Sequence, residues 1–209
     1  MIYLKNLFKA LVKPRSVFEE LQGQVRAREG FLAWGLCMII GFMPAYLVAR
    51  KLDFPFFFID FGVGSSVEIL KILAGLGLNL VLFLAVSFIA TFVARKLGGT
   101  GNFQETLGML GYTKAIIVLK GLMTSIFTFI LWARVISALR MGAEGGAIPP
   151  ELISVFITPA FICIGFFMVW TLFLESTALS VSNGISMKKA VPIMLVLMIL
   201  VNTLMGILL

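Results

Sequence analysis

Apolar stretches, each close to the length of a membrane-crossing helix, alternate with short polar segments along most of the chain. They occupy about 31–48, 70–93, 114–136, 152–174 and 190–209. A helix needs roughly 20 apolar residues to cross about 30 Å of hydrocarbon. The pattern therefore predicts an all-α polytopic membrane protein, with one membrane domain of five transmembrane helices over residues 31–209.

The first 30 residues follow another pattern, in which basic and apolar residues share a helical period. Lys5, Lys9 and Lys13 are four residues apart and fall on one face of a helix, while leucines and other apolar residues fill the opposite face. Such a helix is typical of the membrane interface, where lysines reach headgroup phosphates. We expect this first amphipathic helix to end at Pro14.

A second amphipathic helix is predicted to follow. Ser16 and Glu19 have the spacing of a capping box, in which each side chain binds a free backbone N–H at the start of a helix. We expect this helix to run from Ser16 to Gly30. Residues 1–30 are thus predicted to be two interfacial helices that contact lipid or a protein partner.

The longest polar interruption after residue 70 is the glycine-rich segment 95–112. Gly98, Gly99 and Gly101 can take the positive φ that ends a helix, and Asn102 with Glu105 predicts a capped helix start. A helix continuous from Asn102 to residue 136 would exceed the bilayer thickness, so we expect a bend near Gly111.

This glycine-rich segment lacks the signatures of nucleotide binding. The third glycine of a dinucleotide loop is missing, and so is the Gly-Lys-Ser/Thr of a P-loop. A headgroup phosphate at the Asn102 helix start, with Arg95 and Lys96 nearby, is the ligand that suits it. We expect Lys5, Lys9, Lys13, Arg95, Lys96 and Asn102 to contact anionic lipid or a protein partner.

Composition supports an integral membrane protein. The chain is 60% hydrophobic and 13% charged, with a mean hydropathy of +1.08. Its net charge of +7 comes from basic residues that flank the apolar stretches, so we interpret the charge as a topology signal and expect no nucleic-acid partner. Cys37 and Cys163 fall inside predicted spans and are expected to be packing residues.

Several observations argue against an enzyme, a metal or a cofactor. The chain has no histidine, which removes the commonest general base and transition-metal ligand. Glu19 and Glu20 form an acidic pair, but Arg26 is wrongly spaced for an intramembrane glutamate protease, and Asp53 and Asp60 lack the sequence context of intramembrane aspartyl proteases. We therefore expect no catalytic residue, no metal site and no cofactor.

The distribution of basic residues predicts the orientation. Five spans place the termini on opposite sides, and eleven Lys and Arg residues fall on the side of the N-terminus against five on the other. Because basic residues accumulate on the cytoplasmic side, the N-terminus is predicted to be cytoplasmic and the C-terminus outside. No secretory signal peptide is expected, because lysines interrupt the first apolar residues.

Four polar residues fall within or at the ends of the predicted spans: Asn79, Lys120, Glu175 and Asn202. Ionisable groups inside a membrane are usually functional or paired. The alternative is structural, because Lys120 can reach the interface, Glu175 lies at a predicted span end, and amides often link helices by hydrogen bonds. The sequence leaves both interpretations open.

Several short motifs resemble the Yip1-domain family of membrane proteins. Pro14 and Phe18, within LVKPRSVFEEL, stand where that family has a proline followed by an aromatic residue. The stretch Gly98-Gly99-Thr100-Gly101-Asn102-Phe103 is similar to its GG-x-G-polar-Phe loop, Gly111-Tyr112 to its Gly-Tyr, and Lys189-Ala190 to the start of its last span. The resemblance is to the short prokaryotic members of the family, and the Asp-Leu-Tyr-Gly-Pro motif of the eukaryotic branch does not occur in this sequence.

This resemblance implies a non-enzymatic five-span protein of a prokaryotic inner or plasma membrane, acting as a scaffold or organiser of membrane or partner proteins through its cytoplasmic face. Its expected partners are the lipid bilayer, including anionic lipids, and a membrane or cytoplasmic protein. The alternative is a small transporter or channel that uses Asn79, Lys120, Glu175 and Asn202 as a polar path. Small residues at four-residue spacing are also compatible with a homo-oligomer.

Overall fold

The computed structural model describes the backbone of residues 2–52, 66–140 and 150–208. Side chains are described for residues 5–41, 74–127, 129–130, 159 and 161–204. All regular structure in these ranges is helical, with no strand. The helices are α1 (Ile2–Val12), α2 (Pro14–Leu21), α3 (Ala27–Leu52), α4 (Ser66–Lys96), α5 (Phe103–Thr113), α6 (Ala115–Arg140), α7 (Pro150–Asn183) and α8 (Met187–Leu208).

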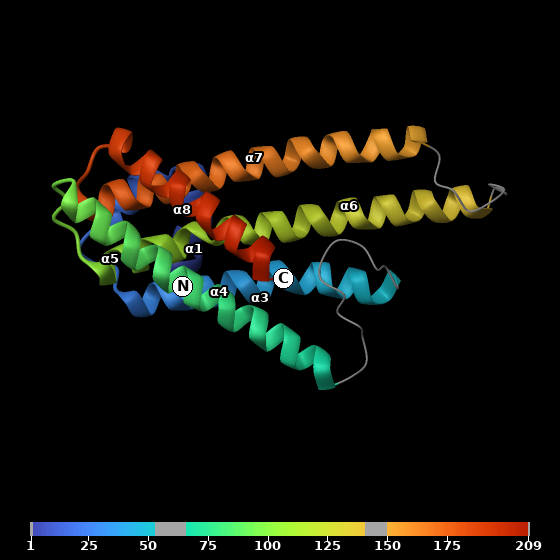
Figure 1. Ribbon diagram of the computed structural model, residues 1–209, viewed down its shortest axis with the longest axis horizontal. Helices are drawn as coiled ribbons and strands as arrows, with labels where there is room; N and C mark the ends of the chain where they lie inside the picture. Colours follow the sequence, from blue (N-terminus) through green and yellow to red (C-terminus); the bar gives the residue numbers. More distant parts are fainter. Residues whose placement is uncertain (1, 53–65, 141–149, 209) are drawn as a thin grey trace.

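The long helices form a bundle that is covered at one end by the short ones. Figure 1 shows α3, α6 and α7 running along the long axis, with α1 and α5 gathered at one end. At that end α2 packs against α7, and α1 packs against α2, α5 and α6. We call this the capped end of the bundle.

Four segments are long and apolar enough to cross a membrane: Ala74–Lys96, Phe103–Phe127, Phe161–Asn183 and Met187–Leu204. The second of these runs through α5 into α6. The first predicted span, 31–48, lies within α3, of which the residues beyond Gly41 are described by their backbone alone. A membrane bundle of several helices is confirmed, while the count of five spans stays a prediction.

The start of the second short helix differs from the prediction. The first helix ends before Pro14 as expected, but α2 begins at Pro14 itself, where a proline costs nothing because the first turn has no partner for its N–H. The Ser16 hydroxyl donates to the Lys13 carbonyl, and Glu19 accepts from the Arg15 Nε at 2.8 Å. The predicted capping box at Ser16 and Glu19 was therefore wrong.

The end of that helix also differs. Helix α2 stops at Leu21, and Gly23 takes a φ of +73°, which a residue with a side chain rarely adopts. Helix α3 then begins at Ala27, with the Arg26 N–H donating to Glu29 Oε2 at 2.8 Å. The predicted helix end at Gly30 was wrong, because Gly30 lies inside the first turns of α3.

Gly30 has another role, which is close packing between helices. A Cβ at Gly30 would overlap the backbone of Leu107 and Gly108 in α5, and a Cβ at Gly111 would overlap the backbone of Gly30. Further along, a Cβ at Gly121 of α6 would overlap the backbone of Gly41 in α3. We call this contact of α3 with α5 and α6 the glycine seam. Close approach of backbones through small residues is how membrane helices gain packing contacts.

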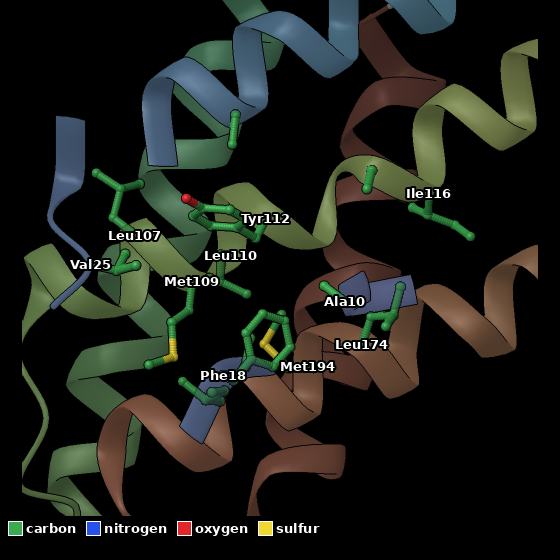
Figure 2. Packing of buried hydrophobic residues seen from close by; sticks show 14 of the residues in the cluster. Ala10, Phe18, Val25, Leu107, Met109, Leu110, Tyr112, Ile116, Leu174 and Met194 are labelled. Atoms are coloured by element: carbon green, nitrogen blue, oxygen red, sulfur yellow. The ribbon is translucent and has the colours of Figure 1, made fainter. Parts of the chain in front are cut away.

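The apolar faces of the two N-terminal helices are buried in protein. Leu7 and Ala10 of α1, and Val17 and Phe18 of α2, are almost fully buried in the main core. Figure 2 shows Phe18 within this core, together with Leu107 of α5 and Leu174 of α7. The amphipathic pattern of residues 1–21 therefore serves a protein contact, and whether the exposed face also lies in the membrane interface stays a prediction.

The glycine-rich segment 95–112 contains a helix end and a capped helix start, as predicted. Gly98 has a φ of +94°, and the Asn102 side chain accepts from the Glu105 N–H at 2.8 Å. Gly99 and Gly101 do not have positive φ. They are required for space, because a Cβ on either would crowd the backbone of Asn183.

The predicted bend near Gly111 occurs three residues later, where α5 ends at Thr113 and α6 begins at Ala115. Lys114 lies at this break, and its N–H bonds the Gly111 carbonyl at 3.2 Å. Gly111 itself stays in α5, buried against Gly30.

Helix α7 is longer than predicted. The polar stretch after residue 174 was expected to be a loop, yet α7 continues to Asn183 and only 184–186 separate it from α8. The Thr177 hydroxyl donates to the Phe173 carbonyl of the preceding turn at 2.7 Å, so this polar residue is accommodated in a helix. Glu175 therefore lies inside the helix, where it is buried.

Candidate functional site

A cavity of about 240 Å³ lies between the helices, with lining residues from each of α3 to α8. Its polar lining residues are Asn79, Lys114, Lys120, Thr171, Glu175 and Asn202. All four intramembrane polar residues singled out from the sequence thus line one cavity. Lys114 and Thr171 were not among them.

The cavity lies where tight packing of the bundle ends. Among the side chains described in α4, which are those of 74–96, the fully buried ones are Phe83, Ser87, Ala90, Thr91 and Ala94, all in the half nearer the capped end. Over 74–82 no residue is fully buried. Likewise the last fully buried residue described in α8 is Leu197. Figure 1 shows α4 diverging from the other long helices beyond this level.

Lys114 and Glu175 form an ion pair in the wall of the cavity. The Lys114 Nζ lies 2.5 Å from Glu175 Oε1, and only 20% and 9% of the two side chains are exposed. The ammonium group also lies 5.7 Å from the centre of the Phe83 ring, within reach of a cation–π interaction. The predicted span 114–136 begins at this lysine, and no spacing rule in the sequence connects it to a carboxylate 61 residues away.

Lys120 contributes a second positive charge to the lining, in α6. It is half-buried and, among the described residues, has no hydrogen-bond or ion-pair partner. Glu175 is the only carboxylate among the lining residues and is already paired with Lys114. The lining therefore carries two ammonium groups against one carboxylate.

The amides and methionines shape the rest of the wall. Asn202 is exposed, and its side chain donates to the Met198 carbonyl of its own helix at 2.7 Å. Asn79 of α4 is half-exposed. Four methionines complete an adaptable apolar surface from three helices: Met38, Met168, Met194 and Met198. The site therefore combines charge with a flexible apolar wall.

The six residues predicted to contact lipid or a partner do not behave alike. Lys5 and Lys9 are exposed on α1, and Lys13 is exposed directly after its last residue. The Lys9 Nζ lies 3.0 Å from Glu20 Oε2, which ties α1 to α2. The row of lysines thus lies on the outside of a helix whose other face is buried.

The other three of these residues have roles within the fold. Arg95 Nε donates to the Gly101 carbonyl at 2.8 Å and so fixes the glycine-rich loop. The Lys96 ammonium lies 5.7 Å from the centre of the Phe92 ring, and Asn102 caps α5. All three residues are exposed. Their predicted contacts with lipid or a protein partner stay predictions.

A buried polar cluster next to this loop was not predicted. Asn183 Nδ2 donates to the Thr106 Oγ1 at 3.0 Å and to the Ser182 Oγ at 2.9 Å. The Thr100 N–H donates to the Asn183 carbonyl at 3.0 Å. The end of α7 is thereby joined to the loop before α5. The only sign of this cluster in the sequence was the polar stretch that follows the predicted span 152–174.

No metal-binding group was found among the described residues, in which no three His, Cys, Asp or Glu side chains cluster. Cys37 is buried, Cys163 is half-buried, and both are free thiols.

Comparison with known families agrees with these features. The model of the Yip1 domain matches residues 8–209, nearly the whole chain. The chain belongs to the Yip1 family. Searches of curated proteins and of solved structures gave no match. This Yip1 member is thus a multi-pass membrane protein of a family that is not known for enzymes.

Proposed function

We propose that this Yip1 protein is a non-enzymatic scaffold that recruits anionic membrane or a partner protein through its capped end. The observation that carries the proposal is the exposed face of α1 together with Lys13 directly after it, where three lysines at four-residue spacing surround two exposed apolar residues. Phe8 is 52% exposed and Val12 is 76% exposed. Basic residues interleaved with apolar ones form the face with which a helix enters the headgroup region.

The rest of the capped end supports this role because it holds α1 in place. The opposite face of α1 is buried, and Lys9 is fixed to Glu20 of α2. The Gly23 N–H donates to Glu105 Oε1 at 3.0 Å, and Gln22 Nε2 donates to the Val181 carbonyl at 3.0 Å. A surface joined to the bundle at several points can transmit a contact to the membrane domain.

The positive charge of this face favours a cytoplasmic location for the capped end, with the N-terminus inside and the C-terminus outside, in a prokaryotic inner or plasma membrane. Each basic residue near an anionic surface contributes about 1 kcal/mol. A second copy of the chain in a homo-oligomer would present two such faces and strengthen the contact through multivalency.

The test uses the full-length protein in nanodiscs of zwitterionic lipid and measures its binding to vesicles that contain phosphatidylglycerol. Alanine at Lys5, Lys9 and Lys13 is expected to weaken binding at least about tenfold, and adding Arg95→Ala and Lys96→Ala is expected to weaken it further. Salt should weaken binding of the natural protein.

The matched control removes three other exposed charges of the same sign, Arg26, Arg28 and Lys188, and is expected to have the smaller effect. Equal losses of vesicle binding in the two triple variants would mean that binding depends only on the net charge of the protein and not on the α1 face. Unchanged vesicle binding together with unchanged crosslinked partners in native membranes would refute the scaffold proposal.

A second candidate function, a polar path for a solute, is favoured by the cavity. Asn202 follows Met187, the first residue of α8, by 15 residues, which is about 22 Å along the helix at 1.5 Å per residue. That distance exceeds half of a hydrocarbon core of about 30 Å. Flux into proteoliposomes that Lys120→Ala and Glu175→Ala abolish would support the path. Flux equal to that of empty liposomes would exclude it.

A further inference from the structure

The cavity has a charge that its own lining does not balance. Lys114 and Glu175 neutralise one another at 2.5 Å, whereas Lys120 faces no second carboxylate among the described lining residues. A charged group removed from water and left without a partner is strongly unfavourable. The cavity is therefore suited to an anion that approaches Lys120.

The walls restrict what kind of anion fits. Most of the lining is apolar, and methionines from α3, α7 and α8 provide unbranched, flexible side chains that adapt to an alkyl chain. At about 240 Å³ the cavity is below the roughly 300–1,000 Å³ that is usual for pockets that enclose drug-sized ligands. It has room for a head group and part of a chain, with the remainder extending out between the helices.

An exit for such a chain exists along α4. In that helix no described residue from 74 to 82 is fully buried, and two residues of this range, Asn79 and Leu82, line the cavity. A chain that leaves here meets the bilayer, because the exposed surface of α4 is apolar, with Val81 61% exposed. The cavity is thus connected to the apolar phase from which an amphiphile would come.

We propose that this cavity binds a single-chain amphiphile with one anionic head group, a carboxylate or phosphate, which pairs with Lys120 while its alkyl chain lies against the methionine wall. The Lys114–Glu175 pair forms the end of the pocket, and its neutrality keeps Lys120 as the charge available to the ligand. This site is distinct from the α1 face, and it does not depend on whether α1 recruits a membrane or a partner.

The test measures equilibrium binding of radiolabelled dodecanoate to the purified full-length protein in a nonionic detergent. Saturable binding of one dodecanoate per chain is expected, with at least about tenfold weaker binding in Lys120→Met, which keeps the length of the side chain and removes its charge. Lys188→Met, a change of the same kind at an exposed residue of α8, is expected to bind as the natural protein does.

Two further probes separate the chain from the head group. Dodecanol should bind equally to the natural protein and to Lys120→Met, since it has no charge to lose. Butyrate should bind at least about tenfold more weakly than dodecanoate, because it lacks most of the apolar contact. Butyrate binding as tight as that of dodecanoate would identify a site for small soluble anions and overturn the amphiphile proposal.

A second variant covers the case in which Lys120→Met does not fold, as judged by its elution from size exclusion and its helical circular dichroism. Met198→Trp fills the cavity from α8 without changing its charge, and is expected to abolish saturable dodecanoate binding. If dodecanoate binds with the same affinity to the natural protein and to Met198→Trp, or does not bind saturably to the natural protein, the proposal is wrong.

Discussion

The two ends of helix α4 show how differently one apolar helix can be packed. Toward the capped end, Ala90 and Ala94 have no exposed surface and Ser87 is fully buried, whereas Val81 and its neighbours toward residue 74 are open. The same helix is therefore part of a close-packed junction toward residue 94 and part of the wall of a charged cavity around Asn79 and Leu82. Packing, rather than hydropathy, separates the region that holds the fold from the region that is free to bind.

The packed region rests on small residues and paired polar groups. Glycines bring α3 against α5 and α6, and the Asn183 cluster joins the end of α7 to the loop before α5. The open region has two lysines six residues apart: Lys114, at the break before α6, is paired with Glu175, and Lys120, within α6, has no ion-pair partner among the described residues. This difference leads to three predictions about stability.

The largest effect is expected in the glycine seam. Gly30→Ala places a methyl group on the backbone of α5 and is expected to lower the free energy of unfolding by about 3 kcal/mol, the upper end for overpacking. Gly35→Ala, on the same helix with no atom within 4 Å of the added Cβ, is the control, and alanine there is expected to leave the protein equally or more stable. Equilibrium unfolding in mixed micelles with SDS measures both. Equal effects would mean that the seam is not close-packed.

The ion pair of the cavity is expected to have the next largest effect. Glu175→Gln leaves Lys114 without its countercharge and is expected to cost about 2 kcal/mol, less than for a fully buried pair because Lys114 retains some exposure. The double variant Lys114→Met with Glu175→Met removes both charges and should recover most of that loss. Lys114→Met and Glu175→Met are also measured singly, and a double variant whose loss equals the sum of these two losses would show that the groups do not interact.

The smallest effect is expected in the polar cluster at the capped end. Asn183→Ala removes the hydrogen bonds to Thr106 and Ser182, but it also removes a buried Asn183 Oδ1 that has no partner among the described residues, so the net cost is about 1 kcal/mol. Asn202→Ala, at an exposed amide that bonds only its own helix among the described residues, should cost less than about 0.5 kcal/mol. The same unfolding measurement applies, and the reverse order would contradict the proposed role of the cluster.

Local signals predicted the structure of the glycine-rich segment, although a similar local signal at Ser16 and Glu19 was misleading. Asn102 and Glu105 have the spacing of a helix start, and Gly98 is the residue type that commonly ends a helix. Both features depend only on the backbone of a few neighbouring residues, so the sequence alone was sufficient to predict them. Length and hydropathy likewise predicted the membrane class, and the short motifs of Gly98 to Tyr112 predicted the Yip1 family.

What the sequence could not predict depends on residues far apart in the chain. Gly30 looked like a helix end because glycine commonly stands there, while its actual role requires α5 to lie against it. Lys114 looked like a flanking charge because its partner, Glu175, lies in another helix. The four intramembrane polar residues could be named individually, but their meeting in one cavity is a property of the folded bundle.

The most direct test of the contrast between a packed junction and an open cavity is thiol accessibility along α4. In a background with Cys37→Ala and Cys163→Ala, Asn79→Cys and Ala90→Cys are each treated with a small, water-soluble methanethiosulfonate in proteoliposomes. The account predicts rapid modification of Asn79→Cys and none of Ala90→Cys in the folded protein. Modification of both at equal rates, or protection of Asn79→Cys, would contradict it.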